Sequence, residues 1–405
     1  MSNLEDIIRT AHREHEGDNG NVEDLINEIK GQLADIPSDG VLRAQAWTNK
    51  EVREDGINPL PDSVHAKYPL PGRKGDYIGA LIKPASTHHF IGILSTAPLP
   101  SNEPESAEVV PTIHVMKIVD EANDHAIEPD RNDLVDFLAG AFSPPDRTAG
   151  ELLLLLLISS PASRPVAMSP LGTLSINFRR KDETATANFA NVIGEVTPRV
   201  VNLPLSIDLL HSHPFLPSST DSSSLDAGLL QLSEGTVLIV EEDAMGSGGK
   251  LEEKAVKNLK ALAECMVEQR VRYEYPYMDG LKMDCAIRVS VLSQGKSLLP
   301  VDIDIPVNGN DNITSQAALP QLRAYLATAS SARHSAKLEI PDDVAEIIQD
   351  AFVQGRRESA NSAEATLKRR MKLARLMALS YPEGKLTKEV WERTVKLDET
   401  IESRK

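Results

Sequence analysis

Cysteine is almost absent from this sequence of 405 residues. The chain has two cysteines, Cys265 and Cys285, and no C-x-x-C pair. Both lie in segments whose other residues are typical of a buried core, and two thiols alone cannot make a four-coordinate zinc site. A protein with so few thiols is expected in a reducing compartment, the cytosol or the nucleus.

Long apolar segments are also missing. The longest apolar run, Leu152–Ile158, is far shorter than the roughly 18 residues that a membrane-spanning helix needs. The stretch from Asn3 to Asp24 is charged throughout, whereas a secretory signal peptide has an apolar centre. We therefore expect a soluble intracellular protein that does not associate with membranes.

Positive charge is in deficit. The chain has 43 Lys and Arg against 60 Asp and Glu, a formal net charge of -17. Proteins that bind nucleic acid usually carry a basic face, so a polyanion is disfavoured as the direct partner. The excess of negative charge is better explained by a protein partner with a basic surface, or by solubility alone. The apolar content of 41% is ordinary, and the length suffices for about two or three domains.

Changes in composition divide the chain into regions. Residues 1–66 are polar, with one amphipathic helix expected around Val22–Leu33, and the Pro-containing stretch 57–62 is interpreted as a linker. Residues 67–120 are expected to form a small β-rich domain. Its expected strands are Tyr77–Ile82, Phe90–Ser95 and Thr112–Ile118.

Strand-like and helix-like segments alternate through residues 121–310, which favours an α/β fold on a largely parallel sheet. Residues 311–405 are expected to form a small helical bundle. The expected strands are Leu171–Phe178, Val200–Leu210, Thr236–Val240 and Ala286–Leu292. The expected helices are Glu151–Ile158, Ala185–Ile193, Ser224–Leu232 and Leu251–Arg270, and the apolar faces of the C-terminal helices begin at Val344, Leu367 and Val390.

Two segments come close to a phosphate loop, and neither meets its pattern. A P-loop, G-x-x-x-x-G-K-[ST], lies between a strand and a helix so that backbone N–H groups surround the phosphates. Gln294–Ser297 follows an expected strand, but Ser290 stands at the first glycine and Pro300 prevents a helix from following. In Gly246–Leu251, Ala244 stands at the first glycine. Both segments are interpreted as flexible loops.

The sequence His211-Ser-His213-Pro is similar to the zinc motif of JAMM-type metallo-isopeptidases, in which two histidines and an aspartate bind zinc. The Ser-x-x-Asp sequences that follow end at Asp221 and Asp226. One lies closer to His213, and the other farther from it, than the motif requires. The simpler interpretation is two loop histidines beside a Pro- and Ser-rich turn.

Three acidic residues, Glu241, Glu242 and Asp243, end the expected strand Thr236–Val240. In α/β proteins the functional groups lie at the carboxyl ends of the strands. A charged run after a strand is equally typical of its solvated end. Both interpretations stay open at this point.

The window Leu225–Met245 resembles the segment that leads into the Walker B strand of the MCM (minichromosome maintenance) replicative helicases. The shared pattern is a small-residue turn, an apolar helix end, a glycine turn, four apolar residues and an acidic pair. By this resemblance Glu241 stands at the position of the metal-organising aspartate, and Glu242 at that of the catalytic glutamate.

From about Tyr68 onward the chain resembles the MCM complex-binding protein family, whose members are also described as MCM-like replisome factors. Residues 1–66 match poorly, so an N-terminal binding function does not carry over. The collinear blocks that carry the resemblance are Tyr68–Gly75, Phe90–Ser95, Pro111–Val115, Glu151–Ile158, Pro170–Asn177 and Ser293–Pro300.

The resemblance implies a degenerate AAA+/MCM-like α/β core followed by a C-terminal helical lid bundle. A phosphate loop would follow the expected strand Leu171–Phe178, but Arg179–Thr186 has no glycine for a close backbone approach. The sensor strand near Leu292 continues with Ser293-Gln294 instead of the asparagine expected in an active MCM helicase, and the position of the helicase's lid arginine falls on Ala365. Three parts of an ATP site are therefore missing.

No catalytic residue, cofactor or metal is consequently expected, and Glu241 and Glu242 are interpreted as a vestigial Walker B pair. The resemblance implies a non-enzymatic nuclear regulator of DNA replication that binds MCM helicase subunits by mimicking one. Such a protein would promote their assembly or their release from chromatin, with a link to sister-chromatid cohesion. Its association with chromatin would be indirect, and it would have no small-molecule substrate. The alternatives are an active AAA+-type ATPase, or a JAMM-like zinc isopeptidase acting through His211 and His213.

Overall fold

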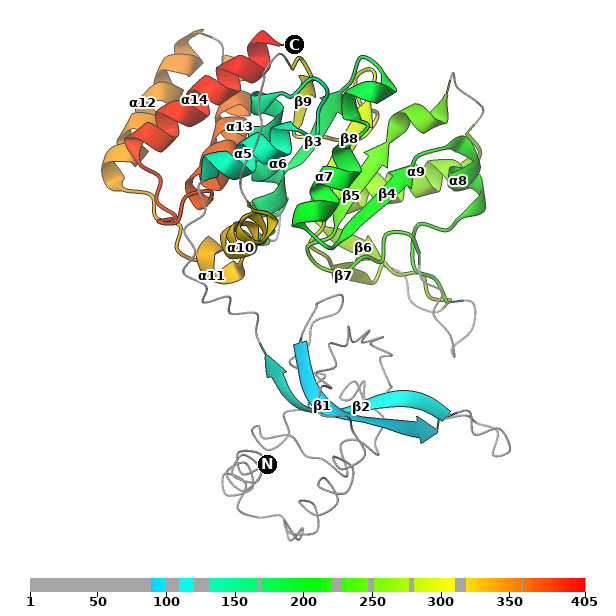
Figure 1. The fold of residues 1–405 in the computed structure, drawn as a ribbon. Coiled ribbons are helices and arrows are strands. Elements are labelled where there is room, and N and C mark those ends of the chain that lie inside the picture. The colour runs from blue at the N-terminus through cyan, green and yellow to red at the C-terminus, as the bar shows by residue number, and fades with distance from the viewer. Residues whose placement is uncertain are drawn as a thin grey trace, which may run out of the picture. The chain divides into compact units, whose positions relative to one another are not determined.

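The chain divides into two compact units, residues 1–122 and residues 123–405, which are described separately (Figure 1). The expected helix Val22–Leu33 and strand Tyr77–Ile82 lie outside the described residues, as does the whole region 1–66. The computed structural model describes residues 89–98, 109–119, 131–165, 169–219, 228–246, 251–276, 280–309, 318–358 and 360–404.

The first unit contains an antiparallel pair of strands, β1 (His89–Pro98) and β2 (Val109–Val119). β2 is rich in Val and Ile, and β1 contains Phe90, Ile91, Ile93 and Thr96; these residue types favour extended backbone. The register shifts once, between Ile91 and Gly92, as at a β-bulge. Of the three strands expected in residues 67–120, the two that fall on described residues, Phe90–Ser95 and Thr112–Ile118, are therefore confirmed.

The second unit contains a five-stranded sheet in the order β4-β5-β8-β3-β9, with every neighbouring pair parallel. The expected α/β fold on a parallel sheet is confirmed. The short strand β9 is an addition that the sequence pattern did not predict. The strands are β3 (Ser175–Arg179), β4 (Val200–Pro204), β5 (Val237–Glu241), β8 (Arg288–Ser293) and β9 (Ile303–Pro306).

Helices cover both faces of this sheet (Figure 1). Successive strand residues point to opposite faces, so Ile239 belongs to one apolar core while Leu238 and Val240 belong to the other. The first core is covered by α5 (Arg131–Ala139), α6 (Arg147–Ile158), α7 (Phe189–Val196) and α10 (Leu319–Ala329). The second is covered by α8 (Ile207–Ser212) and α9 (Glu253–Glu268).

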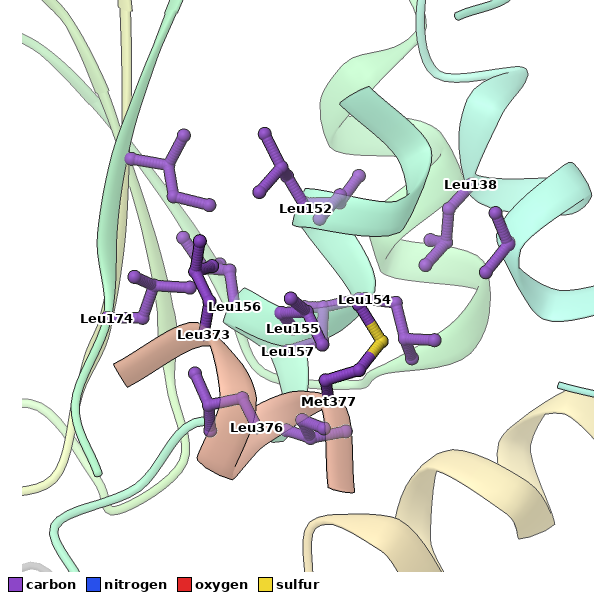
Figure 2. Close-up of a cluster of buried hydrophobic side chains, with 14 of the residues drawn as sticks. Leu138, Leu152, Leu154, Leu155, Leu156, Leu157, Leu174, Leu373, Leu376 and Met377 are labelled. Atoms are coloured by element: carbon purple, nitrogen blue, oxygen red, sulfur yellow. The ribbon is translucent and has the colours of Figure 1, made fainter. Parts of the chain in front are cut away.

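Helix α6 is the centre of the first core. Its six consecutive leucines, Leu152–Leu157, are all fully buried, as expected for a helix that is apolar on every side. Figure 2 shows several of these leucines beside Leu373, Leu376 and Met377. Those residues come from α13, so the C-terminal helices pack directly against α6. The C-terminal helices are α12 (Asp342–Glu358), α13 (Ala360–Leu379) and α14 (Lys388–Ser403).

The expected C-terminal helical region is confirmed, and one apolar core runs from Leu134 to Ile401. Two buried aspartates reinforce its packing. Asp146 begins α6 and accepts a hydrogen bond from Arg404 Nη1 at 2.7 Å. Asp398 of α14 pairs with two arginines of α13, Arg369 and Arg370. The predicted domain boundary at 310 stays a prediction.

The expected strand Val200–Leu210 is confirmed only in its first part, and its second part is wrong. It ends at Pro204, because the Ser206 hydroxyl accepts the Leu209 N–H and starts helix α8. The expected strand Leu171–Phe178 likewise starts only at Ser175.

The expected helix Ala185–Ile193 is divided into a 3₁₀ turn, η1 (Glu183–Thr186), and helix α7. The expected helix Ser224–Leu232 is wrong in its described part. There Leu230 donates its N–H to Phe215, and a Cβ on Gly228 would lie 2.3 Å from the carbonyl oxygen of Phe215. Backbone contact with a neighbouring segment replaces the helix.

The remaining elements are small. The two cysteines do lie in a core: their Sγ atoms are 3.7 Å apart, and the hydrogen bond between them, together with burial, raises the pKa of the Cys265 thiol. Among the helices that the structure describes, none has the length and apolarity to cross a bilayer. The other elements are η2 (Glu242–Met245), β6 (Arg270–Arg272), β7 (Lys282–Asp284) and α11 (Ala332–Ser335).

Candidate functional site at the carboxyl edge of the sheet

Three neighbouring strands, β5, β8 and β3, end at the same edge of the sheet. Because they are parallel and in register, Leu292 of β8 lies opposite Glu241 on one side and Phe178 on the other. The carboxyl ends of parallel strands are where α/β proteins bind their ligands. The structure thus brings together three predicted positions: the turn after Phe178, the acidic triplet that begins at Glu241, and the segment that begins at Ser293.

Arg180, the residue directly after β3, lies across this edge. Its Nε is 2.7 Å from Asp243 Oδ2, and its Nη1 donates to the Thr186 hydroxyl at 2.8 Å. The side chain is only 7% exposed. A phosphate loop presents bare backbone N–H groups at this point, because glycine has no side chain. Here a buried guanidinium fills the space beside the strand end and is neutralised by the chain's own carboxylate.

Asp243 connects all three strand ends. One carboxylate oxygen pairs with Arg180 after β3, while the other accepts the backbone N–H of Gln294, after β8, at 2.9 Å. Asp243 itself lies in η2, the single turn that follows β5. Each oxygen therefore already has a partner within the chain. The sequence had indicated this acidic run without showing what its members bind.

Glu242, the residue expected at the catalytic glutamate's position, is turned toward a loop of its own chain. Its carboxylate accepts the Ser297 hydroxyl at 2.6 Å and the Leu298 N–H at 3.2 Å. It is 8% exposed, and burial raises the pKa of its carboxyl above the usual value. Glu241 is only partly buried, and its carbonyl oxygen accepts the Leu205 N–H.

The pH dependence of stability should report on Glu242. A carboxyl with a raised folded-state pKa contributes stability that is complete below its ordinary pKa of 4.5 and is lost as pH rises through the raised value. Glu242→Gln removes this titration but keeps an oxygen that can accept the Leu298 N–H. We expect the wild-type free energy of unfolding, relative to the glutamine variant, to fall as pH rises above about 4.5. Urea unfolding of both proteins at a series of pH values measures the difference in free energy of unfolding. A difference that does not change with pH would contradict a raised pKa for Glu242.

A second polar group beneath the edge was missed by the sequence analysis. Asn177 of β3 is fully buried; its Nδ2 donates to Asp304 Oδ1 at 3.1 Å, and its Oδ1 accepts the Ser293 hydroxyl at 3.0 Å. Arg179 Nε also lies 3.0 Å from Asp304 Oδ1, as an ion pair without hydrogen-bond alignment. The signal that could have revealed this group is an asparagine between Ile176 and Phe178 in an otherwise apolar strand.

The two histidines of the zinc-like motif lie away from this edge. His211 is in the last turn of α8, and its Nε2 accepts the backbone N–H of Glu252 at 3.1 Å. His213 Nδ1 lies 2.7 Å from the Ser212 hydroxyl. Within the described parts of the chain, no three His, Cys, Asp or Glu side chains are grouped as metal ligands. Asp221 and Asp226 fall outside those parts.

The position expected for a lid arginine, Ala365, is an exposed residue of α13. The nearby arginines of the same helix are turned elsewhere: Arg369 and Arg370 both hydrogen-bond to Asp398 of α14. They hold two C-terminal helices together.

Comparison with known proteins places these observations in a family. The family model described as "Mini-chromosome maintenance replisome factor" matches residues 87–405, which include the whole carboxyl edge of the sheet. The chain belongs to this family. The match confirms the family resemblance deduced from the sequence. The block Tyr68–Gly75, which contributed to that deduction, lies before the matched region.

Relatives of this chain are found in animals and plants. It is 30% identical over 289 residues to the Mini-chromosome maintenance complex-binding protein of Gallus gallus, and 29% identical over 289 residues to that of Homo sapiens; each alignment covers 67% of this chain and 44% of the relative. The protein of that name from Arabidopsis thaliana is 29% identical over 282 residues, and the alignment covers 66% of this chain and 46% of the Arabidopsis protein. The alignments thus span less than half the length of these relatives.

Proposed function

We propose that this protein is a non-enzymatic DNA replication factor of the nucleus that binds MCM helicase subunits. Its family and the names of its relatives support the binding partner. The observation that supports the absence of ATP chemistry is the ion pair of Arg180 and Asp243. The side chain and its partner take up the place beside β3 where a triphosphate would need open backbone N–H groups.

The same proposal includes a mechanism of mimicry. We infer a degenerate AAA+/MCM-like core with a helical lid, because the strands assigned to the phosphate loop, sensor and Walker B positions are adjacent and end together. A chain with a helicase subunit's outline can dock on MCM subunits through the surfaces that they present to one another. It would thereby promote their assembly or their release from chromatin, with an effect on sister-chromatid cohesion. Association with chromatin is then indirect, and neither a membrane nor a small-molecule substrate is involved.

A pulldown against single MCM subunits tests the binding proposal directly. We expect the wild-type chain to retain at least one subunit in the absence of nucleotide, because no ATP-dependent step is involved. Retention of none of them, from a protein shown to be folded by circular dichroism, would overturn the proposal. The same preparation should show no magnesium-dependent ATP turnover above a buffer control.

The alternatives make different predictions for the same sample. An active AAA+-type ATPase would turn over ATP with magnesium and lose that activity in Glu242→Gln. A JAMM-like zinc isopeptidase would contain stoichiometric zinc, lost when His211 and His213 are both replaced by alanine. Elemental analysis of the purified protein distinguishes the second alternative from the proposal.

A further inference from the structure

The segment Ser293–Leu299, which follows β8, carries the most exposed large apolar side chain in the described part of the chain. Leu298 is 70% exposed, whereas the next residue, Leu299, is buried. Removing a leucine side chain of this kind from water stabilises a complex by about 1.5 to 3 kcal/mol. Leu298 makes no contribution of this size to the chain's own core, so its apolar surface is available to another molecule.

The backbone around Leu298 is held firmly from beneath. Glu242 accepts both the Leu298 N–H and the Ser297 hydroxyl, and Asp243 accepts the Gln294 N–H. The Ser293 hydroxyl shares its single proton between the carbonyl oxygen of Gly295 in the same segment, at 2.6 Å, and Asn177 Oδ1. A loop fixed in this way loses little conformational entropy on binding, so its exposed leucine can contribute most of its burial energy.

A free positive charge stands two residues before Leu298 in the sequence. Lys296 is exposed and forms no ion pair with any described residue. The chain as a whole carries a net charge of -17, so a second copy would approach this loop against net repulsion. A single lysine next to an apolar side chain fits a protein surface with an apolar recess bordered by a carboxylate, and it is too little charge to hold a nucleic acid.

We infer that the loop Ser293–Leu299 is a docking element for an MCM helicase subunit, with Leu298 as its apolar contact and Lys296 as its charged one. This inference rests on the proposed function. Glu242, whose position corresponds to a catalytic glutamate in the helicases, acts here as a positioning residue for the loop. The acidic pair at the end of β5 thus serves protein binding through the backbone that it holds.

The test compares single variants in quantitative binding to the MCM subunit that the wild type retains. We expect Leu298→Ala to weaken the affinity about 10- to 100-fold, the equivalent of burying one leucine side chain. Lys296→Glu should also weaken it, and the loss should shrink at high salt because charge attraction is screened. Val256→Ala is the matched control: Val256 is 52% exposed on α9, and this variant should bind like the wild type.

The outcomes separate the two proposals. If the wild type retains no MCM subunit, the proposed function itself is wrong. If the wild type binds and Leu298→Ala binds equally well, the docking loop is wrong while the function stands. Thermal unfolding of each variant checks that the fold is unchanged, as expected for exposed positions. A wild type that dimerises in light scattering, and a monomeric Leu298→Ala, would show that the loop binds a second copy instead.

Discussion

Asp243→Ala is expected to lower the free energy of unfolding by about 3 to 5 kcal/mol, one of the largest effects of any single substitution near the carboxyl edge of the sheet. The variant leaves the Arg180 guanidinium buried without its counter-charge. It also removes the acceptor of the Gln294 N–H, so the residue that follows β8 loses its hydrogen bond to the turn that follows β5. Urea unfolding followed by circular dichroism measures the change.

A paired variant separates the loss of the ion pair from a general loss of packing. Replacing both partners with apolar residues, Arg180→Met with Asp243→Leu, should restore much of the lost stability, because neither charge is then left buried alone. Removal of an exposed carboxylate, Glu346→Ala on α12, should leave the free energy of unfolding almost unchanged. An Asp243→Ala variant as stable as Glu346→Ala would show that Arg180 is accessible to solvent, and the argument that it blocks a triphosphate would fail.

Leu155→Ala in helix α6 is expected to cost about 2.7 to 5 kcal/mol, because it removes apolar contacts and leaves a cavity in a core that cannot fully collapse. Leu155 is completely buried between the sheet and the C-terminal helices (Figure 2). Val256→Ala, an apolar truncation at an exposed position of α9, is the control and should change stability little.

The number of unfolding transitions of Leu155→Ala is as informative as the size of its loss of stability. Because the core is continuous from α5 to α14, we expect one cooperative transition in which the signals of sheet and helices are lost together. Two separate transitions, with the C-terminal helices unfolding first, would show that residues 311–405 are an independent domain and would contradict the shared core.

The centre of the sheet was largely predictable, because β3, β5 and β8 are buried on both faces and therefore appear as short apolar runs. Thr236–Val240 and Ala286–Leu292 were placed correctly to within about two residues at each end, the usual uncertainty of such boundaries. The errors lie where side chains or neighbouring segments compete with the local pattern. Ser206 started a helix inside an apolar stretch, and Gly228 allowed backbone contact with Phe215 where a helix was expected. The short strand β9 was missed because four residues carry too weak a periodicity.

The positions of the candidate site were predictable, whereas its interactions were not. The sequence pointed to Glu241 and Glu242, and to a turn after Phe178 without glycine. It could not show that Arg180 crosses to Asp243, because their positions are far apart in the chain and nothing in either local pattern requires the contact. The same holds for Leu298, whose exposure depends on how the carboxylate of Glu242 holds the backbone.

The packing of α6 against α13 also has a consequence for folding during synthesis on the ribosome. Leu152–Leu157 leave the exit tunnel roughly 200 residues before Leu373 and Met377, a delay of about 10 to 40 s at ordinary rates of translation. During that interval a strongly apolar helix has no C-terminal partner to cover it. The nascent chain therefore exposes a segment of the kind that holding chaperones bind, and the core around α6 is completed only after α13 has been synthesised.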